Sequence, residues 1–179
     1  HIETLARMGV QICPVRDAET LASVDALVIP GGESTTIGML MQRFGLLDEV
    51  GRRIAEGFPV YGSCAGAILL ARRIEESDQP RIGAMDMTVR RNAYGRQVES
   101  FEADVSPTGA DAWTGGAFHG VFIRAPQIVE IGADVIPLLV YEDRPVLVRS
   151  ENLLATTFHP ELTADDRIHR YFVETVARL

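Results

Sequence analysis

The stretch that most constrains this chain is the sequence GSCAG at residues 62–66. An apolar, strand-like run at residues 58–61 meets a helix-like run at residues 65–73 at this point. Small residues on both sides of a nucleophile allow a sharp strand-to-helix turn that lifts the nucleophile out of a sheet. At a helix N-terminus, free N–H groups and the helix dipole favour a thiolate, and the N–H groups can also bind an oxyanion. Cys64 is therefore a candidate nucleophile. The alternative is a small buried hydrophobe, since free cysteines are among the most buried residues.

Strand-like and helix-like segments alternate through the first half of the chain. Residues 25–29 form a continuous apolar run that ends in Pro-Gly-Gly, as expected of a parallel strand buried on both faces. Helical patterns follow at 37–44 and 46–55. Short strand-like runs dominate residues 117–158, and we expect some of them to pair antiparallel. The sequence thus predicts an α/β fold with a mixed, mostly parallel central sheet flanked by helices in a flavodoxin-like, three-layer arrangement.

Composition narrows the possible partners and compartments. A chain of 179 residues suits one domain with a sizeable core, and the net charge of −8 argues against nucleic acid or an anionic membrane as the main partner. We find no signal peptide or membrane-spanning run. The two cysteines have neither CxxC nor metal-ligand spacing, so we expect no metal site and a reducing cytoplasm. Cys13 lies in a β-rich run at residues 10–15 and is expected in the core.

A cysteine nucleophile needs a base, and the four histidines are the candidates. His1 and His169 lie in helical surroundings and are expected at the surface, and His119 suits a satisfied core histidine. His159 differs, because it follows an apolar strand and therefore falls at the same sheet edge as the cysteine turn. Glu161, two residues on, could orient its imidazole. His-Pro-Glu alone would fit a surface turn equally well; paired with the cysteine turn it becomes specific.

GSCAG, FHPEL and PGGES, in this order and spacing, resemble the class I, triad-type glutamine amidotransferases. The finer resemblance is to the family of glutaminase subunits of pyridoxal 5′-phosphate synthase. It is carried by PGGESTTIG, GSCAGAILLA, RNAYGRQVESFE, FIRAP and ATTFHPELT, and it covers essentially the whole chain. The resemblance implies a class I glutamine amidotransferase-like fold and hydrolysis of L-glutamine to glutamate and ammonia.

The resemblance also assigns roles to residues. Cys64 would attack the side-chain amide to give a γ-glutamyl thioester, with His159 as general base and acid and Glu161 orienting it. Backbone N–H groups of Gly31, Gly32 and Ala65 would hold the oxyanion. The family's glutamine contacts correspond to Gly32, Glu33, Ser34, Arg91, Ile123 and Arg124.

Charge logic supports part of this assignment. Glu33 can bind the α-ammonium of free glutamine, and Arg91 or Arg124 can bind its α-carboxylate or hold the loops that do. The alternative for Glu33 is complementarity to a helix dipole. For the two arginines it is a solvated charge or a structural salt bridge.

The resemblance further implies a partner: a (β/α)₈-barrel synthase that uses the ammonia to make pyridoxal 5′-phosphate. The glutaminase itself would hold no cofactor and no metal, and it would gain activity on docking as the Gly31-Gly32 loop takes its productive orientation. Members of the family begin with a buried strand ahead of the helix in which this sequence starts. We therefore expect residues 1–179 to form a single glutamine amidotransferase domain that lacks this first strand.

Three alternatives stay open at this point. The same triad could serve a different acceptor synthase, although RNAYGRQ and FIRAP argue against that. The chain could be a stand-alone cysteine hydrolase or stress protein of the DJ-1-like group, which the Glu33 loop and the segment 159–161 disfavour. It could also be a non-catalytic binding module, although all three triad positions are filled.

Overall fold

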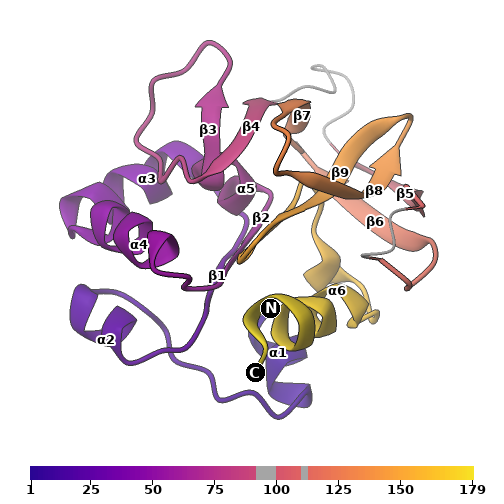
Figure 1. The fold of residues 1–179 in the computed structure, drawn as a ribbon. Coiled ribbons are helices and arrows are strands. Elements are labelled where there is room, and N and C mark those ends of the chain that lie inside the picture. Colours follow the sequence, from indigo (N-terminus) through magenta and orange to yellow (C-terminus); the bar gives the residue numbers. More distant parts are fainter. Residues whose placement is uncertain (92–99, 110–112) are drawn as a thin grey trace.

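The protein folds as a mixed α/β structure in which helices flank a central sheet (Figure 1). The computed structural model describes residues 1–91, 100–109 and 113–179, so much of the RNAYGRQVESFE block lies outside the described residues. The strands are β1 (Leu27–Ile29), β2 (Val60–Ser63), β3 (Ala71–Ile74), β4 (Met85–Arg90), β5 (Ser100–Pro107), β6 (Phe118–Ile123), β7 (Gln127–Ile131), β8 (Ile136–Tyr141), β9 (Arg144–Ser150) and β10 (Leu153–Thr156). The helices are α1 (Ile2–Arg7), α2 (Ala18–Ala22), α3 (Ser34–Arg43), α4 (Leu46–Ala55), α5 (Ala65–Leu70), α6 (Arg167–Arg170), a 3₁₀ turn (Pro160–Leu162) and a π-helical segment (Tyr171–Ala177).

The central sheet has the strand order β1-β2-β10-β9-β8-β5-β6. Strand β2 pairs in parallel with β1 on one side and β10 on the other. The remaining neighbours, from β10 to β6, pair antiparallel. The predicted mixed α/β fold is confirmed, and antiparallel strands take a larger share of the sheet than the sequence led us to expect. Because β1, β2 and β10 run in parallel, their carboxyl ends meet at one edge.

Alternate side chains of β2 pack on opposite faces of the sheet. Val60 belongs to a core shared with α4 and α5, whereas Tyr61 belongs to a second core shared with α1 and the C-terminal helix. This alternation follows from the two-residue period of a strand, and burial on both faces explains why the strand reads as a continuous apolar run. Helices thus lie on both sides of the parallel part of the sheet, in three layers.

The two ends of the chain meet on one face of the sheet (Figure 1). Leu5 of α1 packs in the same core as Phe172 and Val173, which follow α6 in the π-helical segment. This packing brings the first residue of the chain close to α6. None of the helices among the described residues combines the length and apolar content needed to cross a membrane.

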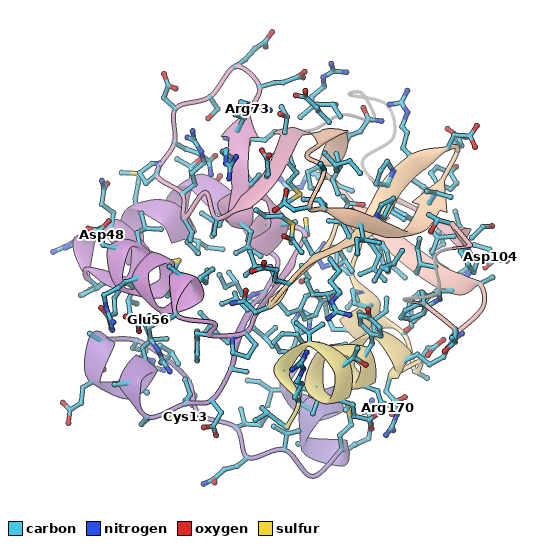
Figure 2. All side chains as sticks on the ribbon, viewed as in Figure 1. Cys13, Asp48, Glu56, Arg73, Asp104 and Arg170 are labelled. Atoms are coloured by element: carbon cyan, nitrogen blue, oxygen red, sulfur yellow. The ribbon has the colours of Figure 1, made fainter. Side chains whose placement is uncertain are left out.

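Two local predictions are wrong. The helix expected over residues 65–73 ends at Leu70, because the chain turns into β3 and pairs with β4 in a second, three-stranded sheet with β7. Residues 10–15 form neither helix nor strand. Val10, Ile12 and Val15 pack against the two cores, which leaves Cys13 exposed at the surface (Figure 2).

Candidate active site

Cys64 stands at the sharp turn between β2 and α5, with a φ of 49° and a ψ of −99°. A positive φ is rare for a residue other than glycine, and such strained residues cluster at functional sites. The flanking glycines make the turn possible. A Cβ atom at Gly62 would overlap the backbone of Gly66, and one at Gly66 would overlap the carbonyl oxygen of Ile29. Close packing of the strand, the helix and β1 therefore requires the Gly-x-Cys-x-Gly spacing.

His159 and Glu161 lie beside this turn, at the carboxyl end of β10. The Nδ1 atom of His159 is 2.9 Å from Oε1 of Glu161, and both side chains are largely buried. The 3₁₀ turn that begins at Pro160 brings the two side chains together, rather than the extended segment that the sequence suggested. The backbone N–H of His159 donates to the carbonyl of Val121 at 2.8 Å, which fixes the segment to β6.

The imidazole of His159 also interacts with Cys64. Burial by itself would lower the pKa of His159, but hydrogen bonds to Cys64 and Glu161 and attraction to both groups raise it to about 9. His159 is therefore protonated at neutral pH, so it can give a proton to a leaving group. The structure thus brings the three residues of the predicted triad together.

Gly31 packs directly against the triad. A Cβ atom there would overlap Cε1 of His159 and lie 3.1 Å from its Nδ1 and 3.5 Å from Cβ of Cys64. Gly32 has a φ of 150°, a conformation that side chains rarely adopt. Ala65 is fully buried at the start of α5, where an N–H group has no partner within the helix. Of the three residues predicted to hold the oxyanion, Gly31 adjoins the His159 ring, Ala65 follows Cys64 in sequence, and Gly32 lines the same cavity as both side chains.

A cavity of about 290 Å³ opens onto Cys64 and His159. It has the size of a small-molecule site rather than a macromolecular groove. All the residues predicted to contact glutamine line this cavity, namely Gly32, Glu33, Ser34, Arg91, Ile123 and Arg124. Ile68, which the sequence did not single out, lines it as well. A larger hollow of about 1400 Å³ lies beside β1 and α1, and neither Cys64 nor His159 lines it.

Glu33 has two roles in the structure. It is the N-cap of α3, where its carboxylate accepts hydrogen bonds from the backbone N–H groups of Thr35 and Thr36. A further bond from the Thr36 hydroxyl and the two backbone bonds lower the pKa of Glu33 to about 2. The carboxylate is thus a permanent anion at the cavity wall. The helix-cap interpretation and the ligand-binding interpretation are both compatible with its position.

Sequence reasoning missed Gln79, which organises one wall of the cavity. Its side chain is 7% exposed, and its Oε1 accepts from Ser34 Oγ at 3.2 Å and from Arg91 Nη1 at 2.7 Å. Arg91 also lies 3.5 Å from Glu33 Oε1. A glutamine in a polar turn carries no periodic or motif signal, so only the fold could identify it.

Ile123 and Arg124 line the cavity from the end of β6. The carbonyl oxygen of Ile123 lies 3.9 Å from Sγ of Cys64. Arg124 has a φ of 43°, another strained non-glycine residue at the cavity. Its side chain is exposed.

The predicted environments of the other three histidines are wrong. His169 is fully buried, and the His1 side chain is 9% exposed, because packing of α1 on α6 encloses both rings. His119 is exposed on β6, where Glu102 and Asp104 of β5 lie within 3.0 Å of its ring nitrogens. Within the described parts of the chain, no group of three or more His, Cys, Asp or Glu side chains could hold a metal ion.

Comparison with known proteins agrees with this geometry. The profile of the SNO glutamine amidotransferase family matches residues 1–178. This chain belongs to the SNO glutamine amidotransferase family. Among its relatives, the pyridoxal 5′-phosphate synthase subunit PdxT of Carboxydothermus hydrogenoformans is 50% identical over 99% of this chain and 92% of its own length. The same subunit of Mycobacteroides abscessus is 52% identical over 98% of this chain and 90% of its own.

Two solved structures resemble the fold of this chain. A crystal structure of a glutamine amidotransferase, 49% identical in sequence, superposes with a TM-score of 0.91 over 99% of this chain and 92% of its own. A second glutamine amidotransferase, from Thermotoga maritima, is 15% identical and has a TM-score of 0.56 over 94% of this chain and 67% of its own. The second likeness extends to the fold alone.

Proposed function

We propose that this SNO family member hydrolyses L-glutamine to L-glutamate and ammonia and supplies the ammonia for pyridoxal 5′-phosphate synthesis. The observation that carries the proposal is the hydrogen bond between His159 and Glu161 beside one small cavity that both His159 and Cys64 line. Membership of a glutamine amidotransferase family gives the reaction class. The names of relatives at about 50% identity give the pathway.

The first half of the reaction makes a covalent intermediate. The Cys64 thiolate attacks the side-chain carbonyl carbon of glutamine, and the carbonyl oxygen becomes an oxyanion. Backbone N–H groups of Gly31, Gly32 and Ala65 are proposed to hold it. The carbon–nitrogen bond then breaks, His159 gives its proton to the departing nitrogen, and ammonia leaves behind a γ-glutamyl thioester.

The second half returns the enzyme to its starting state. His159, now neutral, takes a proton from water as that water attacks the thioester carbonyl. The carbon–sulfur bond breaks, glutamate leaves, and Cys64 is again a thiolate beside an imidazolium. Glu161 holds one orientation and tautomer of the imidazole throughout and stabilises its charged form.

Selection of free glutamine is assigned to the cavity walls. Glu33, anionic at any physiological pH, is proposed to bind the α-ammonium group. Arg91, which Gln79 holds, is proposed to bind the α-carboxylate or to fix the loop that does. Gly32, Ser34, Ile123 and Arg124 complete the proposed glutamine site.

The proposed partner is a (β/α)₈-barrel pyridoxal 5′-phosphate synthase subunit, to which the ammonia passes. Docking is expected to set the peptide orientation of the Gly31-Gly32 loop and so to raise activity. We further propose that residues 1–179 act as one amidotransferase domain without a cofactor or metal of their own. A reducing cytoplasm is the proposed compartment, since the thiol must stay reduced.

The proposal is tested by measuring glutamate release with and without the synthase subunit. We expect slow hydrolysis by the chain alone and clear stimulation when the synthase is added. Unchanged release on adding the synthase would remove the proposed partner and favour a stand-alone cysteine hydrolase. Stimulation by a synthase for a different acceptor would favour the other amidotransferase alternative.

A further inference from the structure

A second hydrogen-bonded group lies behind the triad, on the face where α1 packs against α6. The Nδ1 atom of His1 is 2.9 Å from Nε2 of His169, and Nε2 of His1 is 2.9 Å from Oγ of Ser63. Ser63 directly precedes Cys64 in the turn. The ring of His1 also packs edge-on against Tyr61, with a centroid distance of 5.7 Å. His1 is therefore held on three sides, by groups from β2 and α6.

This group reaches the triad through Glu161. One carboxylate oxygen of Glu161 binds His159, and the other is buried without a hydrogen bond of ordinary geometry among the described residues. Nε2 of His1 lies 3.3 Å from that second oxygen. A buried carboxylate oxygen needs a donor, and a small rotation of either side chain would supply one here.

The pattern of partners assigns the ring protons. His169 is fully buried, and its Nδ1 has no partner in the described parts of the chain. Burial lowers the pKa of His169 to about 4, and the charged side chains that act on it are Glu161, Asp166 and Arg7. The ring is thus neutral, and its single proton belongs on Nε2, where Nδ1 of His1 accepts it.

The direction of the hydrogen bonds that run from His169 through His1 to Glu161 follows from that assignment. Since Nδ1 of His1 accepts, the proton of a neutral His1 is on Nε2, which faces both Ser63 and the second oxygen of Glu161. We propose that His1 and His169 are positioning residues, which donate in series to the second oxygen of Glu161 and so hold its first oxygen on His159. This inference rests on the proposed function, because it gives the pair a role only if Glu161 orients a catalytic His159.

The test uses two substitutions of His169 in the full-length protein, assayed with the synthase subunit. His169→Leu removes the donor to His1, whereas His169→Gln places an amide N–H group close to the position of Nε2. We expect His169→Leu to lower kcat about tenfold, the scale for loss of an outer partner of a functional histidine, with little change in the KM for glutamine. It should also move the alkaline limb of kcat/KM to lower pH, because a loosely held Glu161 stabilises the His159 imidazolium less. His169→Gln should restore most of both.

A purely structural role gives a different result. Both variants would then melt at a lower temperature, and the alkaline limb would stay at its wild-type pH; that outcome overturns the inference. If His169→Leu does not fold, the pair His1→Leu and His1→Gln provides the same comparison, because His1 is the next member of the same hydrogen-bonded series. If His1→Leu and His1→Gln have the same kcat and the same alkaline limb as each other, the inference is also overturned.

Failure of this inference can be told apart from failure of the proposed function. If Cys64→Ala loses activity while His169→Leu behaves like wild type, the triad stands and the positioning pair is rejected. If Cys64→Ala keeps wild-type turnover, the triad itself is rejected, and the positioning role falls with it.

Discussion

The ring of His159 occupies the space that a side chain at Gly31 would need. A Cβ atom at Gly31 would overlap Cε1 of His159, and it would lie only 3.5 Å from Cβ of Cys64. The glycine-rich loop therefore does more than approach the substrate with its backbone. It also leaves room for the imidazole between the thiol and the carboxylate of Glu161.

Gly31→Ala should consequently disable the site without unfolding the protein. The new methyl group would push the imidazole away from Cys64, and a misplacement of about 1 Å can lower kcat on the order of 100-fold. Glutamate release measured with the synthase checks this. Gly51→Ala in α4 is the matched control, since its nearest atom would be 4.0 Å away. It should keep full activity and gain about 0.5–1 kcal/mol of stability. An active Gly31→Ala enzyme would show that the ring position is not critical.

Activity should depend on the protonation of His159. The pKa of His159 is raised to about 9, so its imidazolium form, which protonates the departing amide nitrogen of glutamine, is lost as pH rises through that value. We expect kcat/KM to fall on the alkaline side near pH 9. Glu161→Ala removes one of the two groups that raise this pKa, Cys64 being the other. The alkaline limb should then move to lower pH and kcat should drop by about 100-fold or more.

The raised pKa of His159 also determines the direction in which the free energy of unfolding changes with pH. The folded-state pKa lies above the ordinary value of 6.5, so His159 stabilises the fold fully below that value. This contribution is lost as pH rises through about 9. If the alkaline limb of kcat/KM does not move in Glu161→Ala, that result would contradict the contact between His159 and Glu161.

His169 should make stability depend on pH in the opposite direction. Its pKa is lowered to about 4 by burial, so between the ordinary value of 6.5 and about 4 the unfolded chain binds a proton that the folded chain does not. The free energy of unfolding should therefore fall as pH drops through this window, by on the order of 3 kcal/mol in all. Urea unfolding at pH 7 and pH 4.5 measures the change. His169→Gln should reduce it, and an identical slope in that variant would assign the effect to other groups.

Gln79 should affect substrate binding more than chemistry. Gln79→Leu removes the acceptor for Ser34 and Arg91, so both groups lose their fixed positions at the cavity wall. We expect the KM for glutamine to rise about tenfold, equivalent to one hydrogen bond to a charged group, with a smaller change in kcat. Gln79→Glu retains an acceptor oxygen and should bind glutamine better than Gln79→Leu does. Equal KM values in wild type and Gln79→Leu would remove Gln79 from the site.

Parts of this site could be predicted from sequence because they are encoded locally. Packing around the Cys64 turn dictates its two glycines, and the helix-and-strand periodicity places Cys64 and His159 at strand ends. The local spacing of Glu161 suggested its role, although a 3₁₀ turn brings it to His159 by a different route. The role of Gln79 could not be predicted in this way, because no local sequence pattern links it to Arg91 and only the folded structure brings the two side chains together.

The surface positions predicted for His1 and His169 were wrong for a related reason. His1 and His169 lie in short helical segments whose local pattern permits a surface position. Their burial follows from packing between elements more than 160 residues apart in sequence, as the separation of 168 between the two residues shows. A single polar residue in a helix does not report which neighbour the helix will meet. The core position predicted for Cys13 was wrong in the converse way, because its apolar neighbours pack inward and leave Cys13 exposed.

The most direct test is the rate of glutamate release by Cys64→Ala in the presence of the synthase subunit. Removal of the nucleophile leaves His159, Glu161 and the cavity in place but prevents formation of the thioester. We expect a loss of at least about 1,000-fold in kcat, as for other enzymes deprived of a covalent nucleophile. Turnover at the wild-type rate would contradict the proposed mechanism.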